Sequence, residues 1–157
     1  MPYIDHATVQ VAGEIGFLSA GLGKQVTPRY SLGLMYGVVP PELSKAQSIE
    51  TVTLRQTYRF YDWDRLDLYA GFNLFHVLGL RHEASKFSDV PSGYYPINGF
   101  RGLINLGSSV AIDRQRQTRF YFEAGINDLW LVNFATNTKT IAPSDYVSLG
   151  FGWKTAF

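Results

Sequence analysis

The last twelve residues of the chain, 146–157, alternate between two kinds of side chain. The first set of alternate positions is mostly apolar and comprises Val147, Leu149, Phe151, Trp153, Thr155 and Phe157. The second set is small or polar and comprises Tyr146, Ser148, Gly150, Gly152, Lys154 and Ala156. Because successive side chains of a strand point to opposite faces, this pattern predicts a strand with one apolar face. A face rich in glycine and serine opposite an apolar face is typical of a narrow barrel with lipid outside and a crowded polar lumen inside.

The same alternation recurs along the chain, and helical spacing is not sustained anywhere. We expect strands at about residues 7–23, 30–38, 49–60, 66–75, 100–109, 119–127 and 146–157. These are seven strands, whereas single-chain bacterial barrels have even numbers. We therefore expect eight strands in the natural protein. The eighth lies upstream of Met1, or else a break within 7–23 divides that segment.

The closing segment resembles the last strand of small outer-membrane β-barrels of Gram-negative bacteria. In that class the last strand alternates apolar residues and ends on a C-terminal Phe, which the barrel-insertion machinery reads. The residues that match are Val147, Leu149, Phe151, Trp153 and Phe157. The resemblance implies an all-β fold, an antiparallel up-and-down transmembrane β-barrel of about eight strands. It also implies residence in the bacterial outer membrane.

Composition narrows the other possibilities. A length of 157 residues predicts a single domain over 1–157, and 46% apolar residues suffice for an ordered fold. A net charge of +1 without a basic cluster argues against a nucleic-acid partner. No apolar run reaches the ~18 residues of a transmembrane helix. Residues 1–5 lack the basic and apolar regions of a signal peptide, so export would require a leader that has been removed.

The connections and the aromatic residues give an orientation. Short turns are expected near 24–29, 61–65 and 113–117, and longer loops near 40–48, 79–99 and 133–144. Outer-membrane barrels have short periplasmic turns and longer external loops. Aromatic residues gather in two groups, as expected of girdles at the two membrane interfaces. The group beside the short turns is Tyr30, Phe60, Tyr61, Trp63, Phe120, Tyr121, Phe122, Trp153 and Phe157, and the other is Tyr36, Trp130, Phe134 and Tyr146.

Charged residues also fall on the face predicted to line the lumen. They are Glu14, Arg55, Arg59, Asp67, Arg119, Glu123 and Lys154. Eight strands leave an interior only wide enough for side chains, and buried charges must pair to offset their desolvation. We expect a network of ion pairs and hydrogen bonds that plugs the lumen. A proton- or ion-conducting path along the same residues is the alternative.

The long loop at 79–99 contains the weak candidates for catalysis, His82, Ser85 and Asp89. These are the residue types of a His-assisted Ser hydrolase. A solvated loop is the simpler interpretation, because loops position side chains less rigidly than strands do. His6 and His76 are far apart, so no metal-ligand spacing appears and no cofactor is expected.

Three functions remain open from the sequence. The first is a non-enzymatic outer-membrane barrel with a plugged lumen, whose external loops contact lipopolysaccharide or a protein partner. The second is an outer-membrane acyl hydrolase or acyltransferase that modifies lipid A. The third is a soluble β-barrel that binds a small ligand, which requires the apolar face to turn inward.

Overall fold

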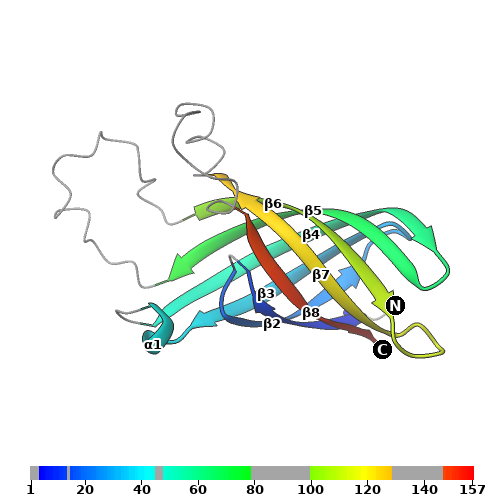
Figure 1. Cartoon of the computed structure of the whole chain (residues 1–157), viewed down its shortest axis with the longest axis horizontal. Coiled ribbons are helices and arrows are strands. Elements are labelled where there is room, and N and C mark those ends of the chain that lie inside the picture. Colours follow the sequence, from blue (N-terminus) through cyan, green and yellow to red (C-terminus); the bar gives the residue numbers. More distant parts are fainter. Residues whose placement is uncertain (1–3, 14, 45–47, 79–99, 129–146) are drawn as a thin grey trace, which may run out of the picture.

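The computed structural model describes residues 4–13, 15–44, 48–78, 100–128 and 147–157. Within these residues, eight antiparallel strands form one closed barrel, in which each strand pairs with the next and β1 pairs with β8 (Figure 1). The strands are β1 (His6–Ala12), β2 (Leu18–Gln25), β3 (Tyr30–Val39), β4 (Ile49–Trp63), β5 (Leu66–Leu78), β6 (Phe100–Ala111), β7 (Thr118–Asn127) and β8 (Ser148–Ala156). A short helix, α1 (Pro41–Ser44), follows β3.

The segment at 7–23, expected as one strand, consists of two, so the count of seven was wrong. β1 ends at Ala12, and β2 begins at Leu18 and runs back along β1. The turn between them contains positive φ angles of 60° at Ala12, 91° at Gly13 and 143° at Gly16. Glycine adopts such angles without steric cost, so Gly13 and Gly16 permit the reversal. All eight strands that close the barrel therefore lie within this chain.

The turn expected at 61–65 is shorter than predicted, because β4 continues to Trp63 and β5 begins at Leu66. The pairing of β4 with β5 shifts register between Arg59 and Tyr61, which marks a β-bulge. A bulge adds one residue to a strand and interrupts the alternation of faces. As a result Phe60 and Tyr61 are both exposed although they are neighbours in sequence.

The two faces of the barrel have opposite polarity. Apolar side chains point outward, with 59% of Leu34 and 62% of Leu106 exposed. Polar side chains point inward, and the exposed fractions of Asn73 and Asn105 are 0% and 1%. A soluble barrel with an apolar interior, the third possibility from the sequence, requires the reverse. An outer face that is mostly apolar is the surface that a bilayer solvates.

Both chain termini lie at one end of the barrel (Figure 1). We call it the terminal end; the connections at 26–29, 64–65 and 112–117 lie there too. The opposite end, which we call the loop end, holds the turn between β1 and β2 and the connection that contains α1. β5 and β7 also end there, and the connections that follow them, 79–99 and 129–146, lie outside the described residues. Among the described residues, no helix is long and apolar enough to cross a membrane.

Aromatic side chains surround the outside of the terminal end. Phe120 contacts the ring of Trp153 edge-on, with 5.7 Å between the ring centroids. Trp63 is 68% exposed just before the turn to β5. One assignment to this group was wrong, because Tyr121 points into the lumen and is only 2% exposed. Trp130, Phe134 and Tyr146 of the second expected group lie outside the described residues.

We predict that a charge on the middle of the outer face destabilises the barrel. Leu106→Arg, halfway along β6, should lower the free energy of unfolding in lipid vesicles by about 2–4 kcal/mol, because arginine is costly at the bilayer midplane. Ile112→Arg, just beyond the end of the same strand and also on the outer face, is the matched control and should lower it by about 0–1 kcal/mol. Equal effects in a denaturant titration would contradict a membrane-facing outer surface.

Candidate functional site: the barrel lumen

A cluster of apolar side chains lies in the lumen toward the loop end. Ile15, in the turn between β1 and β2, is fully buried and clusters with Met35, Phe75 and Leu103. Its carbonyl oxygen accepts hydrogen bonds from the hydroxyls of Ser19 and Thr51, so the turn is held inside the barrel. This cluster lies inside the barrel and brings together side chains of β3, β5 and β6 with that of the turn. We call it the apolar plug.

An ion pair crosses the lumen on the side of the apolar plug that faces the terminal end. The Arg55 guanidinium of β4 donates to Glu123 Oε2 of β7 at 2.7 Å, and both residues are buried. The same carboxylate oxygen accepts from the hydroxyl of Tyr69 at 3.1 Å and from the amide of Asn105 at 2.8 Å. Donors from three strands therefore converge on one carboxylate, which offsets the desolvation of its charge.

The other side of the guanidinium is also satisfied. Its Nη1 donates to Gln10 Oε1 at 2.6 Å and lies 3.3 Å from the hydroxyl of Tyr121. The Tyr121 hydroxyl in turn donates to Gln10 Oε1 at 2.9 Å. The guanidinium carbon lies 4.7 Å from the centroid of the Tyr121 ring, within range of a cation–π interaction. We call the set Gln10, Arg55, Tyr69, Asn105, Tyr121 and Glu123 the central network.

A second charged group lies nearer the terminal end. Asp67 Oδ2 accepts from Arg119 at 2.9 Å and from Arg59 at 3.3 Å, so two cations share one carboxylate. Arg59 also lies 3.3 Å from Asp62 at the exposed rim. Arg119 donates through Nε to the hydroxyl of Ser109 at 3.0 Å. These contacts join β4 to β5, and β5 to β7 across the width of β6.

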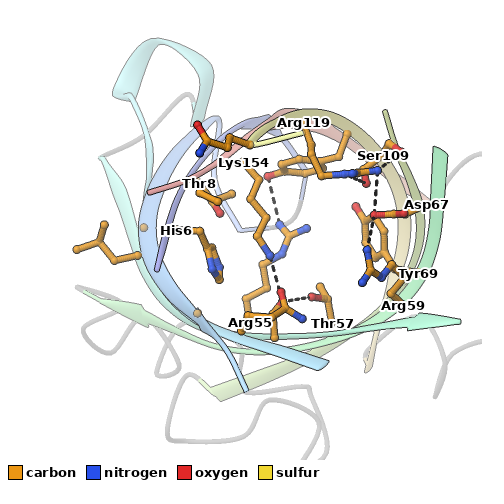
Figure 2. A pocket seen from close by; sticks show the side chains of 18 of the residues that line it. His6, Thr8, Arg55, Thr57, Arg59, Asp67, Tyr69, Ser109, Arg119 and Lys154 are labelled. Atoms are coloured by element: carbon orange, nitrogen blue, oxygen red, sulfur yellow. Dashed lines mark hydrogen bonds and ion pairs between the residues drawn. The ribbon is translucent and has the colours of Figure 1, made fainter. Parts of the chain in front are cut away.

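Lys154 lies in the same half of the lumen. Its side chain extends from β8 across the barrel, and its ammonium group donates to the hydroxyl of Ser31 on β3 at 3.4 Å (Figure 2). Ser31 is in turn hydrogen-bonded to Thr57 at 2.5 Å. Among the described residues, no carboxylate lies within ion-pairing distance of the Lys154 ammonium group.

The strand pair that closes the barrel is anchored at the terminal end by Asp5, which precedes β1. Its carboxylate accepts from the Gln25 amide at 2.8 Å and pairs with His6 Nδ1 at 2.6 Å. Partial burial raises the pKa of Asp5, but the hydrogen bonds from His6 and Gln25 outweigh burial and leave the pKa below its usual value. Its backbone carbonyl also accepts from the Phe157 amide at 3.0 Å, which ties the two termini together.

An open cavity of about 230 Å³ remains between the central network and the terminal end. Figure 2 shows His6, Arg55, Arg59, Arg119 and Lys154 around it. Its lining also includes Arg29 and Arg116 near the turns, so the cavity reaches the rim of the barrel. We call this space the vestibule.

The sequence-predicted residues fall into two groups. The described ones lie on the lumen side as expected from their alternation: Arg55, Arg59, Asp67, Arg119, Glu123 and Lys154. Glu14, His82, Ser85 and Asp89 lie outside the described residues. Sequence reasoning missed the hydroxyls of Tyr69 and Tyr121 as network members. Their signal was the alternation itself, because they occupy the same strand faces as Asp67 and Glu123.

The described residues do not bring together three or more metal-ligating His, Asp or Glu side chains. The arrangement of the lumen can pair charges and hold register. It can also present cations to a small anion at the terminal end.

Comparison with known proteins gives the fold alone. No protein-family model matches the sequence, and no curated protein matches it. A solved structure described as "De novo design of transmembrane beta-barrels" is similar, with a TM-score of 0.54 and 8% sequence identity. The match covers 100% of this chain and 98% of the designed chain. The fold is that of a transmembrane β-barrel.

We predict that Arg55 and Glu123 are strongly coupled. Arg55→Met or Glu123→Gln alone should each lower the free energy of unfolding by about 3–5 kcal/mol, because each leaves a buried partner uncompensated. The double variant should lose clearly less than the sum of the two, as measured by denaturant titration in detergent micelles. Arg116→Met, which breaks an exposed pair with Asp64, is the control and should have little effect. Strict additivity of the two single variants would show that the pair contributes no coupling.

Proposed function

We propose that this chain is an integral protein of the bacterial outer membrane, non-enzymatic, with a lumen closed by its own side chains. The observation that carries the proposal is the combination of the apolar plug and the central network in one narrow barrel. Two successive layers block the lumen: Ile15 and its neighbours, and then the Arg55–Glu123 pair. An ion that crossed would have to displace both a packed apolar cluster and a saturated ion pair.

The proposed orientation follows from the two ends of the barrel. The terminal end, with its short turns, faces the periplasm, and the loop end faces outward, as in barrels of this class. The loop-end connections at 79–99 and 129–146 are the longest in the sequence. External loops of this length are the segments available to contact lipopolysaccharide or a protein partner. The fold supplies a rigid base for such contacts.

A conductance measurement tests the closed lumen. Wild-type protein in planar lipid bilayers should show no steady conductance steps. Arg119→Ala should also stay closed, because Arg119 lies in the vestibule and both blocking layers remain. Combining Ile15→Ala, Arg55→Ala and Glu123→Ala removes both layers and should give steady steps. Each variant must first retain a heat-modifiable band in SDS gels, which reports a closed barrel. Steady wild-type conductance would overturn the closed lumen.

The proposed location predicts a role for the last residue in assembly. Phe157 is 69% exposed, and its hydrogen bond to Asp5 is through the backbone amide, so its side chain contributes little to the folded barrel. In cells of a Gram-negative host, with a secretory leader supplied, Phe157→Ser should reduce the heat-modifiable protein in the outer membrane several-fold. Ala156→Ser is the matched control and should not. Refolding of both variants in detergent should equal wild type. An unchanged yield for Phe157→Ser would count against recognition of the C-terminus by the insertion machinery.

A further inference from the structure

The vestibule has an uneven distribution of charge. Cationic side chains in its lining outnumber carboxylates by six to one. The cations are Arg29, Arg55, Arg59, Arg116, Arg119 and Lys154, and the carboxylate is that of Asp67. Positive groups held this close in a low-dielectric enclosure repel one another and attract an anion.

Several of these cations are already neutralised. Arg55 is paired with Glu123 at the inner boundary of the vestibule, and Arg116 with Asp64 at the rim. Arg59 and Arg119 share Asp67, and Arg59 also pairs with Asp62 at the exposed rim, so the two cations of this group are balanced by two carboxylates. These pairings leave the vestibule with an excess of positive charge, which includes the charge of Lys154.

Lys154 is the residue that most needs a partner. Its ammonium group reaches across the lumen and contacts the neutral hydroxyl of Ser31 at 3.4 Å. A partly buried ammonium group with one neutral acceptor has lost much of its hydration, and the Asp5 carboxylate attracts it without lying within ion-pairing distance. The charge of Lys154 therefore favours an anion as its partner.

The remaining lining favours an oxyanion of small size. The hydroxyls of Thr57 and Ser109 lie beside the cations and supply further donors (Figure 2). Guanidinium groups bind phosphate oxygens in a fork geometry, and a lysine adds a point charge. A volume of about 230 Å³ lies below the ~300–1,000 Å³ of pockets for drug-sized ligands, so acyl chains do not fit.

We propose that the vestibule is a binding site for a phosphate-class oxyanion, held by Lys154, Arg59 and Arg119 and open at the terminal end. The anion is either free phosphate or the phosphomonoester of a small headgroup, which have the same chemistry. The site depends on the barrel geometry and is independent of whether the lumen conducts.

Thermal unfolding in an amine-oxide detergent, which carries no phosphate, tests the site. Inorganic phosphate should raise the unfolding midpoint of wild type above that in sodium chloride of equal ionic strength, because a ligand that binds only the folded state stabilises it. Lys154→Met should remove most of this difference and weaken phosphate binding at least tenfold by isothermal titration calorimetry. Glycerol 3-phosphate, run in parallel, distinguishes the two sources: tighter binding of the ester indicates a headgroup, and tighter binding of phosphate indicates the free ion.

Arg114→Gln is the matched control. Arg114 is exposed in the turn at the same end and does not line the vestibule, so its removal lowers the local charge by the same amount without touching the site. Its phosphate affinity should stay within about twofold of wild type. Lys154→Gln keeps a polar side chain and guards against loss of fold in Lys154→Met. Equal phosphate stabilisation in wild type and both Lys154 variants would overturn the proposal, since it would reflect only the general exclusion of phosphate from protein surfaces.

Discussion

The pairing of β1 with β8 is the constraint on which the rest of the structure depends. A membrane interior offers no water to backbone N–H and C=O groups, so a sheet survives there only if it has no free edge. Residues 6–12 of β1 meet residues 150–156 of β8 over the whole length of β1, which removes both edges at once. The hydrogen bond from the Phe157 amide to Asp5 extends this closure past the strand ends.

Closure with eight strands then determines the chemistry of the interior. The middle of the lumen is too narrow for bulk water, so the polar side chains there must satisfy one another. The Glu123 carboxylate does so with donors from Arg55, Tyr69 and Asn105, which lie on three different strands. Such contacts stabilise one strand register relative to registers shifted by one residue. A shift by one residue would turn each of these groups toward lipid. The network inside the lumen therefore also stabilises the alignment of the strands in the barrel wall.

The two ends of the lumen differ in the polarity of the side chains that line them. At the loop end, a turn bends inward and places Ile15 among apolar side chains, which need no partners. Gly37 makes room for this turn, since a Cβ there would collide with the Ile15 carbonyl oxygen. At the terminal end the lining is cationic and a cavity persists around Lys154. One end of the lumen thus holds an apolar cluster, whereas the other has a cationic lining around a cavity.

By itself the sequence determined the fold class and the face on which each described charged residue lies. Both follow from strict alternation, which is a local property of strands: Arg55 and Glu123 had to point inward once Leu54 and Phe122 pointed outward. The break between β1 and β2 was harder to predict, because Ile15 and Phe17 continue the alternation of Val9 and Val11 through the turn. In the structure, positive φ angles at Ala12, Gly13 and Gly16 mark the break.

The tertiary structure alone decided which charges meet. Arg55 and Glu123 are 68 residues apart, and their contact depends on how far each strand is staggered along the barrel wall. That stagger is set cooperatively by all eight strands as they close, so no local pattern reports it. The same closure turned Tyr121 from an expected girdle residue into a partner of Arg55. It also left Lys154 opposite a hydroxyl rather than a carboxylate.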